Sequence, residues 1–336
     1  MMISQYFGMS KRACDMQAKT LKTMQFRLRT AMGDSTQQYS HSTDTPIHGT
    51  GQGSCASPAI WLTLSSILMD CLNELAGGMT MKNVTNELEL IQWINGFVDD
   101  TSLFCNNLVN INDIAALRQK LKDDMIIWQQ LLEASGGKLE LSKCFYYILT
   151  WSFDSEGFAI ADSIADQRKQ IAQIEIPLSG SIKSIAITQK EPGEAHKTLG
   201  CYKTIIGCEK EQAKYLQQKA DRMAFQAQHS VMTRKQARLA YNCKYISSLR
   251  YGLPSCSLSR ETIDKIQQAP VAQFLSKMGY ERKFPRAIVF APQDCGGINL
   301  PNLYTEMLGL KLETLISNIR SNSELGQAIM VNINTL

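Results

Sequence analysis

Two adjacent carboxylates, Asp99 and Asp100, are the residues of this 336-residue chain best placed to do chemistry. They separate two short apolar stretches, residues 91–98 and 101–105, which predicts a β-hairpin with both carboxylates at its tip. Two like charges so close together repel each other, and burial would add a desolvation cost. A divalent cation removes that cost, because Mg²⁺ accepts one or two carboxylates together with the phosphate oxygens of a substrate. The pair therefore indicates metal-assisted phosphoryl transfer.

Other interpretations of these residues stay open or are disfavoured. Paired aspartates are common in surface turns, so a purely structural turn remains an alternative. A metal nuclease is disfavoured, because no cluster of Glu or His accompanies the pair in the sequence. His41 and His48 lie in a polar loop without a paired ligand, a poor pattern for zinc, and we interpret them as surface histidines.

The elements that must position the pair follow from periodicity and caps. Ser10 can cap an amphipathic helix that we expect to run to Gly33, and Pro58 opens an apolar helix that ends at residue 75. Residues 111–134 place apolar side chains on one helical face, and Gly136 ends that helix. Further expectations are a hairpin formed by residues 144–151 and 158–161 and a strand at residues 182–187. This order predicts an α+β layer.

Helices dominate after about residue 205. One is expected over residues 213–231, a second begins at a capping box of Thr233 and Gln236, and a third is interrupted at Pro270. A C-terminal helix begins near Leu303.

Charge is divided unevenly along the chain. The formal net charge is +4, but residues 41–160 carry −8 and residues 201–290 carry +10. Such a basic block is typical of proteins that bind polyanions, because cations that replace phosphate counterions gain free energy. We expect nucleic-acid contacts from Arg234, Lys235, Arg238, Lys244 and Arg250, with Tyr241 and Tyr245 among them. An ordinary solvated helix face is the alternative.

Several classes of protein are excluded by the same sequence. The longest nearly apolar run, residues 59–69, is well short of the roughly 20 residues that span a bilayer. No secretory signal is recognisable at the N-terminus, and the ten cysteines are scattered without a CxxC pair. We therefore expect an intracellular protein, cytoplasmic or nuclear, that is not secreted, has no membrane partner and carries free thiols.

Four short motifs carry a resemblance to a known family. Residues 96–104, Gly-Phe-Val-Asp-Asp-Thr-Ser-Leu-Phe, resemble the aromatic-x-Asp-Asp hairpin of reverse transcriptases, in the form closest to retrotransposons that lack long terminal repeats, and the other three motifs follow that family's order along the chain. Residues 51–58, with Gln52, Gly53 and Pro58, resemble its Gln-Gly motif at the start of a palm helix. Residues 136–144 are similar to its Gly-x-x-Leu-Asn-x-x-Lys segment, with Glu140 in place of Asn. Residues 196–200, His-Lys-Thr-Leu-Gly, are similar to the segment that joins palm and thumb.

The resemblance implies RNA-directed DNA polymerisation with Mg²⁺, deoxynucleoside triphosphates, an RNA template and a DNA primer. Asp99 and Asp100 would be the catalytic metal ligands, and Lys143 would lie near the leaving pyrophosphate. Gln52, Gly53 and Phe97 would contact nucleotide or template.

The family's first metal-binding aspartate has no counterpart here. It precedes the Gln-Gly motif on a strand, whereas Asp15, Asp34 and Asp44 follow no apolar strand. We therefore expect a partial polymerase palm at 1–206, without fingers, a helical thumb at 207–254 and a helical extension at 255–336. Loss of one ligand of a two-metal site predicts a truncated, inactive enzyme, and the alternative is a non-catalytic nucleic-acid-binding relic that uses the basic thumb.

Overall fold

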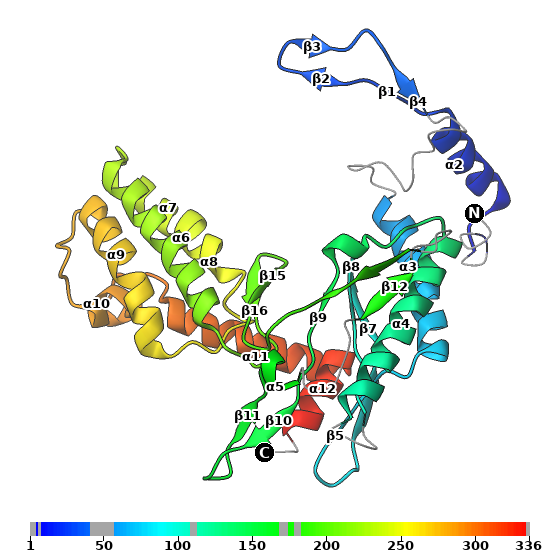
Figure 1. Cartoon of the computed structure of the whole chain (residues 1–336). Helices are drawn as coiled ribbons and strands as arrows, with labels where there is room; N and C mark the ends of the chain where they lie inside the picture. The colour runs from blue at the N-terminus through cyan, green and yellow to red at the C-terminus, as the bar shows by residue number, and fades with distance from the viewer. Residues whose placement is uncertain are drawn as a thin grey trace. The chain divides into compact units, whose positions relative to one another are not determined.

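A computed structural model describes residues 5, 8–40, 57–107, 113–167, 174–177 and 183–333. The chain forms two compact units, each built from several stretches of sequence (Figure 1). Unit 1 consists of Met1–Met81, Ile91–Tyr146 and Gln167–Gln189, and unit 2 of Lys82–Leu90, Tyr147–Asp166 and Lys190–Leu336. The fold mixes helices with small, mostly antiparallel two-stranded sheets, which agrees with the α+β expectation.

Two long helices and one hairpin form the centre of unit 1. The helices are α3 (Ser57–Leu75) and α4 (Ile114–Ala134), and the hairpin pairs β7 (Ile94–Phe97) with β8 (Asp100–Leu103). Pro58 occupies the first turn of α3, where its missing N–H costs nothing, and Asp113 caps α4 through the Ala116 N–H. Figure 1 shows β7 and β8 alongside the two helices. All three elements were predicted from the sequence.

The N-terminal segment is shorter as a helix than its periodicity predicts. Helix α2 (Lys11–Thr23) begins at the Ser10 cap as expected, but Met24 is extended and ends it. Four short strands follow: β1 (Gln25–Phe26), β2 (Arg29–Thr30), β3 (Gly33–Asp34) and β4 (Tyr39–Ser40). Phe26 stacks on Tyr39 across the β1–β4 pair at 5.2 Å, and this cross-strand contact replaces the helical turn. The expected helix up to Gly33 is therefore wrong beyond Thr23.

Helix α4 also contacts β12 (Glu175–Pro177), one of four further short strands. The other three are β9 (Phe145–Tyr146), β13 (Ser184–Ala186) and β14 (Thr188–Gln189). Strand β9 pairs in parallel with β14, and β12 pairs with β13. The expected hairpin around residues 154–157 is present, because residues 151–153 pair with residues 159–161, but the expected extension of its first strand back to residue 144 is wrong. The buried Arg118 of α4 donates to Gln189 Oε1 at 2.9 Å and so connects the helix to β14.

Unit 2 begins with hairpins and continues as helices. The hairpins are β10 (Trp151–Phe153) with β11 (Ala159–Ala161), and β15 (His196–Thr198) with β16 (Cys201–Lys203). The helices are α6 (Lys210–His229), α7 (Arg234–Ala240), the π-helical turn η2 (Tyr241–Ile246), α8 (Ser247–Arg250), α9 (Arg260–Met278), α10 (Arg286–Phe290), the 3₁₀ turn η3 (Gln293–Cys295), α11 (Leu303–Ser321) and α12 (Glu324–Ile333). Four shorter elements complete the chain: β5 (Met79–Lys82), β6 (Glu89–Gln92), the 3₁₀ turn η1 (Leu141–Lys143) and α5 (Ile164–Gln167).

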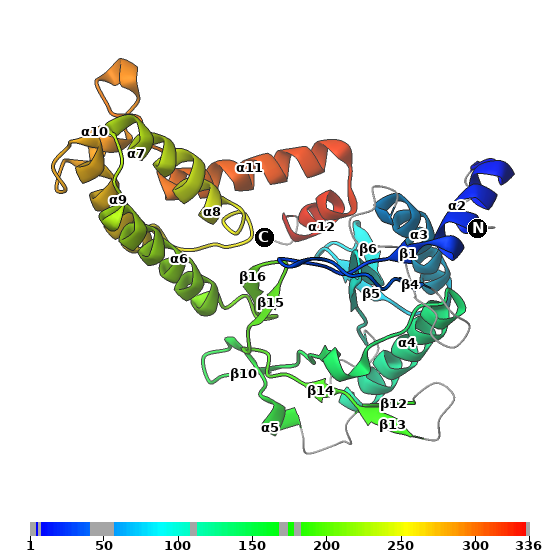
Figure 2. The same cartoon turned by 90° about the horizontal axis from the view of Figure 1, so that it is seen from above.

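One hydrophobic core joins the helices of unit 2. Helix α6 runs beside α9 (Figure 2), and the buried side chains come from α6, α7, η2, α8, α9, α10 and α11. The capping box of Thr233 and Gln236 is present as predicted. Helix α9 continues through Pro270, whose side chain is buried, so the expected interruption at this residue is wrong. Buried side chains between Leu216 and Met307 thus belong to one core.

Candidate active site at the Asp99–Asp100 hairpin

The predicted carboxylate hairpin is present in unit 1. Phe97 pairs with Asp100, so Val98 and Asp99 form a two-residue turn and Asp100 is the first residue of β8. Val98 has φ of 57°, a left-handed conformation that is rare for a β-branched residue. Such a conformation costs on the order of 1–3 kcal/mol and persists where the surroundings impose it, often at functional sites. The tip that carries both carboxylates is therefore strained.

Gly96 allows the hairpin to lie close against helix α3. A Cβ atom at this position would be 2.3 Å from the methyl carbon of Met69. Below the tip, Ile94 and Leu103 pair across the hairpin and pack on a cluster of Leu68, Leu72 and Trp128 from α3 and α4. Both helices thus fix the position of the two strands.

Side-chain alternation along the strands puts the Asp100 carboxylate on the face of the hairpin that points away from the helices. Ile94 and Thr101 lie on the helix side, whereas Phe97 and Asp100 lie on the other side and are exposed. Asp99 is exposed as well. Phe97 retains 57% of its accessible surface and Val98 60%, so an apolar surface borders the two carboxylates. An exposed face of this kind can receive a substrate.

The end of β8 is held by polar contacts to α4. Lys120 Nζ donates to the carbonyl oxygens of Gly78 at 3.2 Å and Asn106 at 3.0 Å.

Two titratable groups near these contacts are shifted by burial. Asp124, only 5% exposed, accepts a backbone hydrogen bond from Gly77, while its burial raises its pKa. Burial also raises the pKa of Cys105 to about 11, so this thiol is uncharged and unreactive at neutral pH.

Asp99 and Asp100 suit a hard cation, but they form only part of a metal site. Their carboxylate oxygens are ligands that Mg²⁺ prefers, and phosphate oxygens of a substrate commonly complete its shell. Within residues 57–107, 113–167 and the other described stretches, no group of three or more His, Cys, Asp or Glu side chains is arranged to hold a metal. Asp15 is exposed on α2, and Asp34 forms an ion pair with Arg29 at 2.7 Å.

The segment predicted to carry Lys143 approaches the same apolar cluster. Leu139 packs against Leu68, Leu72 and Trp128, the cluster that also supports the hairpin. Lys143 follows on η1, a 3₁₀ turn and not the start of a strand, and its side chain is exposed. Glu140, the residue in place of the family's Asn, accepts from Ser142 Oγ at 2.5 Å, which lowers the pKa of its carboxyl.

Gln52 and Gly53, predicted to contact nucleotide or template, lie outside the described residues, as do Asp44, His41 and His48.

Two of the five predicted nucleic-acid-binding cations have polar partners within unit 2. Arg238 donates to the Ile298 carbonyl at 2.8 Å, and Arg250 forms an ion pair with Glu306 at 3.5 Å. Arg234 is exposed and lies close to Gly279, and Lys235 and Lys244 are exposed as well.

Tyr241 and Tyr245 do not belong to a binding surface. Both are completely buried in the core of unit 2, beside Phe274. Burial raises the pKa of both phenols. The expectation that they accompany the basic residues at a duplex is therefore wrong: their i, i+4 spacing marks the core face of the helix.

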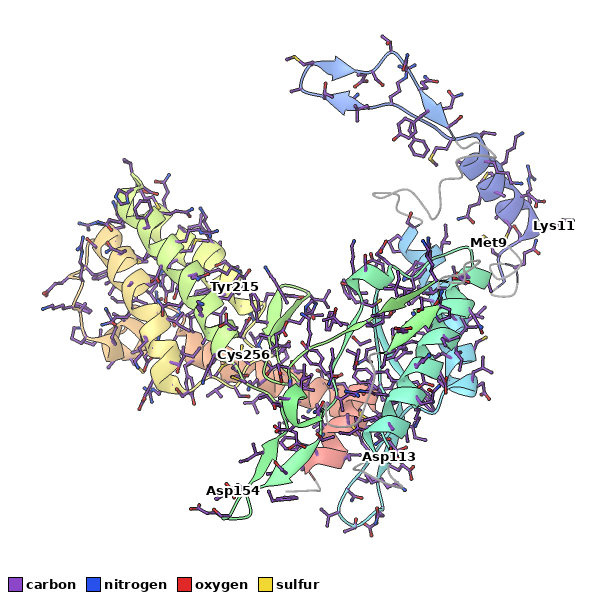
Figure 3. All side chains as sticks on the ribbon, in the orientation of Figure 1. Met9, Lys11, Asp113, Asp154, Tyr215 and Cys256 are labelled. Carbon is purple, nitrogen blue, oxygen red and sulfur yellow. The ribbon has the colours of Figure 1, made fainter. Side chains whose placement is uncertain are left out.

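A cluster of lysines and tyrosines at the β15–β16 hairpin was missed. Leu199 and Gly200 both have positive φ, as a type I′ turn requires, and Lys197 pairs with Tyr202 across it. Lys197 and Lys219 lie over the ring of Tyr215 at 4.8 and 5.4 Å. Figure 3 labels Tyr215. The positions of Lys197 and Tyr202, symmetric about Leu199–Gly200, are the sequence signal that could have revealed it.

No protein-family model matches the chain, and no curated protein matches it. No described helix is both long and apolar enough to cross a membrane.

Proposed function

We propose that this chain is a reverse-transcriptase-like protein of retrotransposon origin, with a palm at Asp99–Asp100 that acts on an RNA template and a DNA primer. The observation that carries the proposal is the strained two-residue hairpin tip, with two adjacent carboxylates, supported by Gly96 on helix α3. The order of the four sequence motifs supports it independently.

The chemistry follows from the residues at the tip. A bound Mg²⁺ would supply charge neutralisation for the phosphates and activation of the attacking hydroxyl. Asp99 and Asp100 would hold that ion, while exposed Phe97 and Val98 would contact the sugar or base of the nucleotide strand. Because the described residues offer no third carboxylate at this point, we propose that the chain binds metal and primed template but has little polymerase activity alone.

Metal placement tests the proposal without requiring turnover. Fe²⁺ replaces Mg²⁺ in the presence of ascorbate, peroxide and a primed RNA–DNA duplex, and cleavage of the protein backbone is mapped by mass spectrometry. We expect cleavage centred on residues 98–101 that is lost in Asp99→Asn. Asp154→Asn is the matched control, because Asp154 also lies at a hairpin turn but in unit 2. Cleavage that is unchanged in Asp99→Asn would contradict the proposal.

Primer extension provides the second test. Wild-type chain, Asp99→Asn and Asp154→Asn are given a primed RNA, deoxynucleotides and Mg²⁺. We expect little extension by any of the three. Robust templated extension that requires Asp99 would show that the missing ligand comes from elsewhere in the chain, and the proposal of low activity would be wrong.

The second candidate function is non-catalytic nucleic-acid binding by unit 2. The observation that favours it is the lysine and tyrosine cluster of Lys197, Tyr202, Tyr215 and Lys219, together with the net +10 of residues 201–290. Binding through phosphate contacts weakens as the salt concentration rises, and the slope of log K against log salt concentration reports the number of contacts. We expect Lys197→Ala to reduce that slope by about one unit, and Lys19→Ala, exposed on α2 and outside the basic block, to leave it unchanged. Binding that does not respond to salt would exclude this candidate.

A further inference from the structure

Helix α11 of unit 2 carries apolar side chains on two faces. One face, with Leu303 and Met307, is buried in the core of unit 2. The second face carries four large apolar residues at spacings of four, four and three, which place them along one side of the helix. We call this set the α11 stripe: Leu308, Leu312, Ile316 and Ile319. Its side chains are between 37% and 56% exposed, far more than those of the core face.

Helix α12 does not cover the α11 stripe. It folds back beside α11 (Figure 2), and Gly326 lies so close to the Asn318 carbonyl that any Cβ would clash with it. Asn318 lies eleven residues, or three turns, after Met307 and therefore on the core side of α11. The stripe stays exposed beside this contact. A contiguous exposed apolar surface of this kind marks a protein–protein contact.

The charged residues of α11 divide in a similar way. Glu306 and Lys311 have polar partners elsewhere in unit 2, an ion pair and a hydrogen bond. Glu313 and Arg320 flank the stripe, are exposed and have no ion pair among the described residues. They cannot pair with each other, because seven residues separate them by about 10.5 Å along the helix axis. One acidic and one basic group are thus left beside the apolar surface.

These two charges become complementary when two copies of α11 pack antiparallel. In a pair related by a two-fold axis, a contact of residue i with residue j is repeated as a contact of j with i. Glu313 then faces the partner's Arg320, and Arg320 faces the partner's Glu313. The axis passes midway between them, and this point lies between Ile316 and Ile319 of the stripe. The charges and the apolar residues therefore agree on one register, with flanking ion pairs beside an apolar seam.

We propose that the α11 stripe binds a second copy of this chain, as an antiparallel pair of α11 helices with Glu313 opposite the partner's Arg320. A partner of uniform charge would match only one of the two groups, whereas a second copy matches both. One helix pair buries less surface than a stable dimer usually does, so we expect a dissociation constant of about 10 µM. The pair uses no residue of the Asp99–Asp100 hairpin and does not depend on the proposed function.

Sedimentation velocity of the whole chain tests whether a dimer forms. We expect a monomer at about 1 µM and a dimer at about 300 µM, on either side of the expected dissociation constant. A chain that remains monomeric at the higher concentration would overturn the proposal. Open-ended larger assemblies would overturn it as well, because an isologous pair closes at two copies.

Charge reversal tests the partner and the register together. Glu313→Arg and Arg320→Glu each place like charges opposite one another twice, which should weaken dimerisation by about tenfold or more. An equal mixture of the two variants should dimerise as wild type does, because each variant then meets opposite charges on the other. If the mixture dimerises no better than either variant alone, the proposed register is wrong. Recovery in the mixture also shows that both variants fold.

Two further variants separate the stripe from general effects of charge. Glu281→Arg makes the same change of charge at an exposed position of unit 2 outside α11, and it should dimerise as wild type does. Ile316→Ser removes an apolar side chain beside the proposed axis and should abolish the dimer. Because Ile316 is exposed in the single chain, we expect its far-ultraviolet circular dichroism to stay unchanged. Undiminished dimerisation of Ile316→Ser would place the contact elsewhere and overturn the proposal.

Discussion

The carboxylate hairpin of unit 1 and the helical core of unit 2 differ in how much buried structure supports them. The hairpin is a two-stranded sheet on a cluster whose buried members are Leu68, Leu72 and Trp128. The core of unit 2 joins buried side chains from many helices, including Tyr241, Tyr245 and Phe274. Binding sites often lie in the less stable parts of a protein, because a site has to exchange ligands and adjust. The candidate site therefore lies on a hairpin that packs against few buried side chains, whereas the helices of unit 2 share a larger buried core.

The largest expected effect on stability comes from removing one buried aromatic side chain from each core in turn. Trp128→Ala and Phe274→Ala each remove a buried aromatic side chain, which costs about 3–5 kcal/mol. We expect Trp128→Ala to release the hairpin and α3 while unit 2 keeps its protection, because the three-residue cluster cannot compensate. Phe274→Ala should lower protection throughout α6, α7 and α9 but leave the helices in place. Amide hydrogen exchange, resolved by peptide, measures both.

Equal loss of protection in both units after either substitution would break the comparison. It would mean that the two units unfold together as one cooperative system. Leu62→Ala is a suitable control, because this side chain of α3 is 67% exposed and its removal should cost little.

A smaller effect is expected where the hairpin meets α3. Gly96→Val places side-chain atoms where Met69 now lies, so the strands must move away from the helix at a cost of about 1–3 kcal/mol. Met69→Ala in the same chain should restore part of the stability, because it vacates that space. Urea unfolding followed by tryptophan fluorescence measures the single and double variants. If Met69→Ala gives no recovery in the Gly96→Val background, the close approach of the hairpin to α3 is not what Gly96 provides.

Local signals predicted most of the elements that carry the site. The carboxylate hairpin, the helix opened by Pro58, the helix ending at residue 134 and the capping box at Thr233 depend on residues close in sequence, and all are present. The helix α2 was extended too far because apolar spacing alone cannot detect a partner strand. Tyr39, which stacks on Phe26, lies thirteen residues away from it.

Burial and partners were less accessible from the sequence. Tyr241 and Tyr245 stand among basic residues in the sequence, yet the helix turns them into the core and leaves Lys244 outside. The partner of Arg238 is the carbonyl of Ile298, sixty residues away in sequence, so a count of charges could not show that this cation is engaged. Gln212 Oε1 accepts from the Tyr202 N–H at 2.8 Å, while its Nε2, which lies beside Gly252, has no partner among the described residues. Side-chain function of this kind is set by tertiary contacts that no short motif encodes.

The two tyrosines buried in the core of unit 2 differ in the hydrogen bonding of their hydroxyl groups. Tyr241 donates to the Pro301 carbonyl at 2.8 Å, whereas the hydroxyl of Tyr245 has no partner among the described residues. Tyr241→Phe should therefore cost about 1 kcal/mol, and Tyr245→Phe should be neutral or stabilising, because it removes a buried polar group that lacks a hydrogen bond. Thermal unfolding of the two variants, each the control for the other, measures the difference. Equal destabilisation would show that the Tyr245 hydroxyl is in fact satisfied.

The smallest expected effect concerns pH and separates the two units again. Burial raises the pKa of Asp124 above its usual 3.8, so its contribution to the stability of unit 1 is fully present below about pH 3.8 and is lost as pH rises through the raised value. Asp124→Asn keeps an oxygen that can accept from the Gly77 N–H but does not titrate, so its unfolding free energy should fall less over that interval than that of wild type. Urea unfolding at a series of pH values above 3.8, followed by tryptophan fluorescence, measures the two slopes. Asp123→Asn is the control: Asp123 is the exposed neighbour of Asp124 on the same helix, so its replacement should retain most of the wild-type slope. Identical slopes for wild type and Asp124→Asn would show that titration of the buried carboxylate does not affect the stability of unit 1.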